Sequence, residues 1–277
     1  MIMTTKRWRN VRLFALAILV SISHLLGGCS TLSNDRGWGQ DATIKPGWDV
    51  VRDSAIRAAK SPYTWAPLAG AALLQVGDWD SELAEWASEN TPVFGSQESA
   101  RDASGFLKDL SAAAWLGTSI ATPSGDSSGD WLLAKTKGIA VGASAIGLTG
   151  GITSVVKDWS NRTRPNGSNN NSFPSGHSSS ASAFATLAAR NVQSIDMNAN
   201  LRKTMEISFG VIAVGTAWAR VEGNVHYTSD VLAGMALGHF VAAFINDAFM
   251  GLDNSATGSV ALALTSESVS IGFWRAF

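Results

Sequence analysis

Three short segments of the chain carry side chains that could bind and transfer a phosphoryl group: 157–165, 172–178 and 220–234. In the first segment, Lys157 and Arg164 are seven residues apart, which is two helical turns, so both cations can face the same side. Pro165 then ends the helix and leaves Arg164 at its rim. Two fixed cations at the mouth of a loop suit a phosphate, because an arginine can bind its oxygens bidentately.

The second segment contains Pro174-Ser-Gly-His at the start of a predicted helix. Gly176 lets the backbone approach a ligand closely, and the N–H groups of the first turn form a cradle for an anion. Ser175 can add a hydroxyl group to this cradle. Taken alone, the same four residues also describe an ordinary helix start at which His177 is exposed.

The third segment contains His226 and Asp230, four residues apart at the start of another predicted helix. A carboxylate at this spacing can hold one ring nitrogen and leave the other free to attack. An isolated pair of this kind is more often a surface pair. If a leader containing His24 is removed, three histidines remain, and two of them lie in these segments. The third, His239, lies in an apolar helix and is predicted to be structural.

The ordered pattern Lys-x6-Arg-Pro, Pro-Ser-Gly-His and Arg-x5-His-x3-Asp resembles the signature of the type 2 phosphatidic acid phosphatase and vanadium haloperoxidase superfamily. The three parts span residues 157–230. Each part alone is weakly or moderately specific, whereas the ordered triple is highly specific. One position departs from the pattern: the serine that commonly precedes the arginine of the third part is Ala219 here. This change removes at most a secondary hydroxyl group.

The resemblance implies an all-α fold, a helical bundle with the active site at one end of four core helices. It implies that His226 is the nucleophile, that Asp230 orients it and that His177 protonates the leaving oxygen, after which water hydrolyses the phosphohistidine. It assigns phosphate binding to Lys157, Arg164, Ser175, Gly176 and Arg220. The family needs no metal for phosphatase chemistry, and the sequence has no HxH motif or paired cysteines. We therefore expect neither a metal nor a cofactor.

Two other functions stay open at this point. A vanadate-dependent haloperoxidase would use the same pocket to hold vanadate, and a non-catalytic envelope lipoprotein would keep the fold without turnover. The complete set of polar groups favours the phosphatase. The substrate is open between lipid phosphates, such as phosphatidic acid or a polyprenyl diphosphate, and small soluble phosphomonoesters.

The composition favours packed helices and gives no sign of a nucleic-acid partner. The chain has 277 residues, of which 45% are hydrophobic, and a formal net charge of −1. Ala, Gly and Ser are abundant while Val and Ile are not dominant, which favours helices over a sheet. No basic block and no basic face interleaved with aromatic residues is present in the sequence.

Apolar periodicity predicts a helical domain over residues 48–252. The resemblance implies that this is the phosphatase domain. The expected helices cover 48–60, 68–77, 80–90, 97–122 and 175–192. The stretch 138–156 contains 19 residues without a charge and could span a bilayer. Its many Gly, Ala, Ser and Thr residues favour instead a helix buried in a globular, lipid-tethered domain. Within 253–277, two short apolar runs at 260–264 and 269–273 flank a polar turn and predict a β-hairpin.

Residues 1–28 resemble a secretion signal. Four basic residues lie within the first twelve, a mostly apolar run follows, and Leu26-Gly-Gly precedes Cys29. This box resembles the cleavage site of bacterial lipoproteins, whose cysteine is acylated and becomes the new N-terminus. We therefore expect a lipid anchor at Cys29, a tether over 29–47, and a location in the cell envelope, on the outer membrane facing the periplasm. An ordinary signal peptide and an N-terminal anchor helix are the alternatives.

Overall fold

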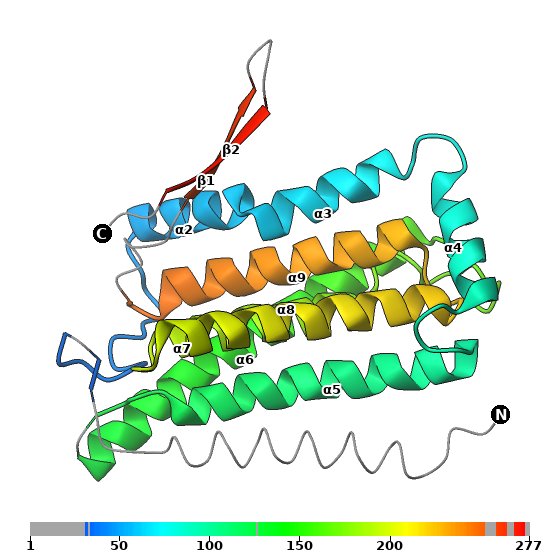
Figure 1. The fold of residues 1–277 in the computed structure, drawn as a ribbon. Coiled ribbons are helices and arrows are strands. Elements are labelled where there is room, and N and C mark those ends of the chain that lie inside the picture. The colour runs from blue at the N-terminus through cyan, green and yellow to red at the C-terminus, as the bar shows by residue number, and fades with distance from the viewer. Residues whose placement is uncertain (1–30, 33, 126, 253–258, 265–268, 275–277) are drawn as a thin grey trace.

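The computed structural model of the protein describes residues 31–252, apart from 33 and 126, and the backbone of residues 259–264 and 269–274. Its elements are α2 (Trp48–Lys60), α3 (Pro62–Leu73), α4 (Trp79–Asn90), α5 (Gln97–Ala121), α6 (Ser128–Ser160), α7 (Gly176–Gln193), α8 (Ala199–Glu222), α9 (Thr228–Phe249), β1 (Ser259–Leu264) and β2 (Val269–Trp274). The predicted helical fold is confirmed (Figure 1). The predicted signal peptide and Cys29 lie outside the described residues.

Most element boundaries follow local sequence signals. Helix α5 begins after Ser96, whose hydroxyl accepts a hydrogen bond from the backbone N–H of Ser99 at 3.1 Å. The C-terminal hairpin is present, with β1 and β2 paired antiparallel. The helix predicted over 68–77 is wrong in its bounds, because α3 begins at Pro62 and continues through Pro67. A proline at the first helical position needs no N–H partner, so Pro62 starts the helix.

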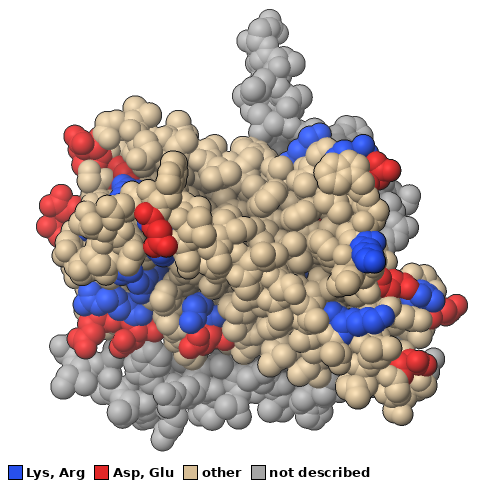
Figure 2. All heavy atoms as spheres, turned by 180° about the vertical axis from the view of Figure 1, so that it is seen from behind, with Lys and Arg blue, Asp and Glu red and all other residues tan. Residues whose placement is uncertain are grey.

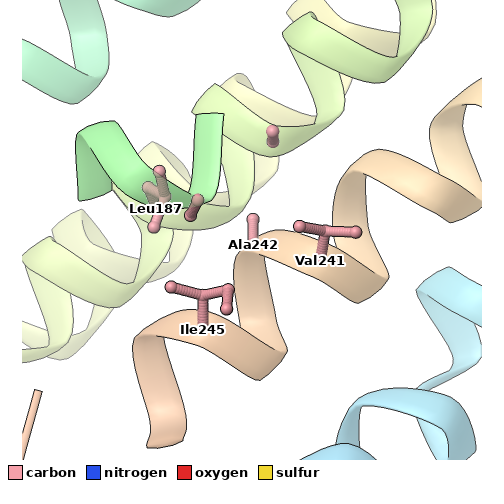
Figure 3. Packing of buried hydrophobic residues seen from close by; sticks show 6 residues of the cluster. Leu187, Val241, Ala242 and Ile245 are labelled. Carbon is pink, nitrogen blue, oxygen red and sulfur yellow. The ribbon is translucent and has the colours of Figure 1, made fainter. Parts of the chain in front are cut away.

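Helices α7 and α9 lie side by side in the middle of the bundle. On its other sides α7 packs against α5, α6 and α8, while α9 also packs against α2, α3 and α6. Small residues permit this close approach: a Cβ atom added to Gly238 of α9 would lie 2.1 Å from the backbone oxygen of Ser179 in α7. Leu187 of α7 packs with Val241 and Ile245 of α9 in the apolar core (Figure 3). The abundance of small residues therefore serves tight helix packing.

One end of the bundle collects four helix termini. Helices α6 and α8 end there, and α7 and α9 begin there, because the segments 161–175 and 223–227 join each pair of helices at this end (Figure 1). Helix α4 lies across the same end. The arrangement brings segments that are distant in sequence to one place.

Helix α6 is not the buried core helix that its composition favoured. Only 22% of its most apolar 18-residue window is buried, compared with 61% in α9. Thr149 and Thr153 are buried on one side of α6, whereas Leu148, Ile152 and Val155 are exposed on the other. The small residues bring one face of α6 close to α7 and α9, but within the described residues the opposite face has no covering helix. By length and composition, α6 and α9 could each cross a membrane.

The segment expected to be a tether is packed against the bundle at Trp38, which is 2% exposed. The backbone N–H of Trp38 donates to the backbone oxygen of Pro123 at 2.7 Å. Lys135 Nζ lies 5.2 Å from the centroid of the indole ring. A Cβ atom on Gly138 would come within 2.3 Å of that ring. The polar composition of 29–47 did not predict this docking, in which Trp38 is a buried aromatic side chain.

Candidate active site

The eight residues predicted to form the site all lie at the end of the bundle where the four helix termini meet. Lys157 is in the last turn of α6, and Arg164 is in the loop that follows. Ser175 is the N-cap of α7, and Gly176 and His177 are in the first turn of that helix. Arg220 is in the last turn of α8, His226 is in the next loop, and Asp230 is in the first turn of α9. The backbone N–H of Ser175 donates to the backbone oxygen of Asp230 at 3.0 Å, which joins α7 to α9. A Cβ atom on Gly176 would lie 3.9 Å from Lys157 Cε.

The cations of this site carry buried nitrogen donors that other protein groups do not satisfy. Among the described residues, Arg164 Nε and Arg220 Nε are buried without a hydrogen-bond partner. Arg220 is 9% exposed and is held by Ser104, to whose hydroxyl its Nη1 donates at 3.0 Å. Lys157 Nζ donates to the backbone oxygen of Asn171 at 2.7 Å. Buried donors of this kind require acceptors, and an anion with several oxygens supplies them.

His226 has the environment that a neutral nucleophile requires. The residue is 2% exposed, and its Nδ1 lies 3.6 Å from Asp230 Oδ2. Burial and the charges of Arg220 and Lys157 lower the pKa of His226 to about 4, although Asp230 acts in the opposite direction. The imidazole is therefore uncharged at neutral pH. Because Nδ1 faces the carboxylate, Nε2 is the nitrogen that is left to attack.

His177 is half-buried beside the same cluster of cations. Burial, followed by the charges of Arg220 and Lys108, lowers the pKa of His177 to about 4. A general acid must carry a proton, so this value by itself does not suit the predicted role. A phosphate dianion bound among the cations reverses the local charge and raises the pKa of a neighbouring histidine.

Ser175 is used first as a helix cap. Its hydroxyl oxygen accepts from the backbone N–H of Ser178 at 3.5 Å and from the hydroxyl of Ser178 at 3.0 Å. A serine hydroxyl has one hydrogen to donate in addition to its acceptor sites. That hydrogen is the group that Ser175 could offer to a phosphate oxygen.

Sequence reasoning missed the residues that hold Asp230. The Asp230 side chain is fully buried and accepts hydrogen bonds from Tyr227 N at 2.8 Å, Ser172 Oγ at 2.5 Å and Arg162 Nη1 at 2.7 Å. Ser172 and Arg162 lie inside two of the segments singled out in the sequence, but no role was assigned to them. Arg162 also donates from Nη2 to Asp80 Oδ2 at 2.8 Å. No signal in the sequence pointed to Asp80.

The potential metal ligands do not gather in the described part of the chain. No group of three or more His, Cys, Asp or Glu side chains in that part is placed to hold a metal ion. Three of the charged side chains at the site, Lys157, Arg164 and Arg220, are cations, and these suit an anionic ligand.

The structure presents buried cations and a carboxylate-backed histidine at one end of a helical bundle. Comparison with known proteins shows what part of this chain is similar to. Residues 166–251 match the family model of the PAP2 superfamily. A 93-residue stretch is 36% identical to phosphatidylglycerophosphatase B of Bacillus subtilis, over 31% of this chain and 46% of that protein. A 99-residue stretch is 34% identical to lipid A 1-phosphatase of Porphyromonas gingivalis, over 36% of this chain and 21% of that protein. Over residues 166–251 the chain is therefore similar to the PAP2 superfamily.

A solved structure has the same fold. The structure of a transmembrane PAP2 type phosphatidylglycerolphosphate phosphatase from Bacillus subtilis superimposes with a TM-score of 0.50 at 24% identity. The match covers 66% of this chain and 92% of that one. By contrast, the matched stretches span less than half of either curated relative.

Proposed function

We propose that this chain is a metal-independent phosphatase that hydrolyses phosphate esters through a phosphohistidine on His226. The observation that carries this proposal is the meeting of buried, unsatisfied arginine nitrogens with a neutral histidine backed by a carboxylate. The arginines attract and orient the phosphate, and the histidine supplies an uncharged nitrogen beside it. Preorganised cations of this kind also stabilise the charge that develops in the transition state.

The proposed reaction has two steps. In the first, His226 Nε2 attacks phosphorus, the bond from phosphorus to the ester oxygen breaks, and His177 gives its proton to that oxygen. In the second, a water oxygen attacks phosphorus, the phosphorus–nitrogen bond breaks, and His177 takes a proton from the water. Asp230 supports the positive charge on the phosphorylated ring in the first step. The products are an alcohol and inorganic phosphate, and both histidines return to their starting states.

We infer that the substrate is a lipid phosphate and that the bundle lies in a bilayer. Leu148, Ile152, Val155 and Trp159 form an exposed apolar row on α6, the last of them 86% exposed. On the face shown in Figure 2, charged side chains gather toward the two ends and leave a broad uncharged region between them. Exposed apolar surface of this extent is costly in water and is typical of a membrane contact. Both curated relatives are named as enzymes that act on lipids.

A lipid chain would also have a place to lie beside the bundle. A groove of about 510 Å³ runs between α5 and α6 and is lined by apolar residues, including Leu116, Ile146 and Phe184. The N-terminal half of α5 contributes Ser104 to the site through Arg220, and α6 contributes Lys157. The groove therefore lies between two helices whose other halves reach the site. In this arrangement, a lipid whose headgroup is bound at the site could place its acyl chains in the apolar groove between α5 and α6.

The test is an activity panel on the full chain purified in detergent. We expect release of phosphate from phosphatidic acid and phosphatidylglycerophosphate in preference to short-chain or soluble phosphomonoesters, retention of activity in EDTA, and inhibition by vanadate. His226→Ala should abolish turnover and the acid-labile phosphoenzyme without lowering the melting temperature. Activity lost in EDTA and restored by Mg²⁺ would contradict the mechanism. Halide oxidation with added vanadate would favour the haloperoxidase, and inactivity on every phosphate would favour a non-catalytic role.

A further inference from the structure

A pair of charged residues lies behind Asp230 and belongs to none of the motif positions. Asp80 is the second residue of α4, the helix that lies across the end of the bundle, and it is 5% exposed. Its Oδ2 accepts from Arg162 Nη2 at 2.8 Å, and its Oδ1 accepts from the backbone N–H of Ser229 at 2.8 Å. The Ser229 hydroxyl donates to the same carboxylate. The carboxylate is thus fixed from two elements, the loop after α6 and the start of α9.

Arg162 bridges the two carboxylates. Its Nη1 donates to Asp230 Oδ1 at 2.7 Å while its Nη2 reaches Asp80. The guanidinium carbon lies 4.1 Å from the ring centroid of Tyr227, which covers one face of the group. With 28% of its side chain exposed, Arg162 is held on several sides rather than extended into solvent. Asp80, Arg162 and Asp230 therefore form a row of alternating charge that ends beside His226, the proposed nucleophile.

The charges in this row decide what each member does. An arginine next to Asp230, with no second carboxylate, would offset the negative charge that must support the phosphorylated ring of His226. Asp80 compensates that arginine, so the three side chains together keep a net charge of −1, the same as Asp230 alone. At the same time the arginine fixes the orientation of Asp230 through Oδ1, which leaves Oδ2 toward the histidine. Buried networks of this kind strengthen their members and hold them in place.

We propose that Asp80 and Arg162 are positioning residues for the phosphatase reaction, which hold Asp230 toward His226 and set the charge behind it. The inference rests on the proposed function. It adds α4 to a site that the sequence motifs place only on the helices around the core and the loops that join them. Neither residue touches the phosphate, so their effect reaches the reaction through Asp230.

The groups that face His226 are known from each element around it. Lys157 approaches from α6, His177 from α7, Arg220 from α8 and Asp230 from α9, as the charges that act on the two histidines show. Arg162 contacts Asp230, and Asp80 contacts Arg162. Changing the charge of either should therefore move the ionisation of His226 without altering the phosphate-binding cations.

The experiment compares Asp80→Asn, Arg162→Gln and the double variant in the full chain. Each single variant should lower kcat on the order of 10- to 100-fold, the size expected for misplaced catalytic groups, with little change in KM. The acid limb of the pH profile, which reports His226, should move to higher pH in Arg162→Gln, because a cation is lost. In Asp80→Asn it should move to lower pH, because the cation is left uncompensated. The double variant should recover part of the loss seen in Asp80→Asn.

Controls separate this proposal from a structural role and from failure of the proposed function. Glu82→Gln removes an exposed carboxylate from the same helix and should behave as wild type. A wild type without phosphatase activity overturns the proposed function. Active wild type and Glu82→Gln, together with an unchanged Asp80→Asn, overturn only the positioning role. A lower melting temperature in both single variants, with no shift in the pH profile of either, also overturns the positioning role. If Asp80→Asn does not fold, Arg162→Lys, which keeps the charge, should shift the acid limb less than Arg162→Gln, and equal profiles would refute the charge argument.

Discussion

Asp230 accepts a hydrogen bond on its backbone oxygen from the backbone N–H of Ser175, with the two atoms 3.0 Å apart. The bond joins the first turn of α9, which carries the carboxylate facing His226, to the N-cap of α7, which directly precedes Gly176 and His177. The proposed nucleophile and the proposed acid are therefore held by two helix starts that are bonded to each other.

The first prediction concerns the role of His177. His177→Ala should slow hydrolysis of an alkyl or lipid ester far more than that of a nitrophenyl ester, because a good leaving group needs little help from a proton. The phosphoenzyme should still form with the nitrophenyl ester. Steady-state rates across a series of leaving groups measure the effect. Equal losses across the series would refute the assignment of His177 as the acid.

The second prediction concerns Asp230. Asp230→Asn should lower kcat on the order of 10³- to 10⁴-fold, because the imidazole loses both its orientation and the nearby negative charge. Inhibition by vanadate should persist, since the phosphate-binding cations are unchanged. Asp158→Asn removes an exposed carboxylate near the end of α6 and serves as the matched control. An Asp230→Asn variant with normal kcat would exclude a role for the carboxylate in catalysis.

The third prediction is the pH dependence of the first step. Burial lowers the pKa of His226 from 6.5 to about 4. A histidine attacks only when it is neutral, and a lowered pKa extends the neutral form to lower pH. With a nitrophenyl ester, whose leaving group needs little proton help from His177, and after correction for ionisation of the substrate phosphate, the acid limb of kcat/KM should therefore lie near pH 4 rather than near pH 6.5. An acid limb near the ordinary histidine value would mean that His226 is more exposed to water than the structure shows.

The fourth prediction concerns the docking of residues 31–47. Trp38→Ala should release this segment from α6, because the indole is 2% exposed and fills a site against Gly138. Loss of a buried tryptophan typically costs about 3–5 kcal/mol, and limited proteolysis within 31–47 measures the release. Trp48→Ala, at a tryptophan that is 75% exposed, is the control and should leave cleavage unchanged. Equal resistance of wild type and Trp38→Ala would show that other contacts hold the segment.

The fifth prediction separates two attachments to the membrane. Cys29→Ala should give an unprocessed precursor without lipid label if the cysteine is acylated. Because α6 exposes an apolar face and could cross a bilayer, we expect the variant still to resist extraction from membranes by alkaline carbonate. Lipid label on the variant would contradict acylation at Cys29. Release by carbonate would contradict the inference that the bundle lies in the bilayer. It would favour the globular, lipid-tethered domain that the sequence predicted.

The sequence by itself determined the helical class and the candidate site. The ordered spacing of Lys157, Arg164, His177, Arg220 and His226 names a set of residues, and the structure brings that set to one end of the bundle. Local signals also placed several boundaries, such as the N-cap at Ser96 and the strands of the hairpin. The boundaries depend on residues within a few positions of one another, where spacing alone fixes which side chains meet. The site residues were found from the ordered motifs, and the folding of the bundle brings them together.

Only the tertiary structure decided which distant residues support the site and which helix face is left uncovered. Arg162 meets Asp80 and Asp230 across 82 and 68 positions of the chain, and no local spacing encodes such a contact. Along 138–156 the small residues allow close packing on one face, but composition does not say whether a neighbour covers the other. In the structure α7 and α9 occupy one side of α6, and Leu148 and Val155 are exposed on the other. Burial depends on where the remaining helices pack, and the sequence of one helix does not contain that information.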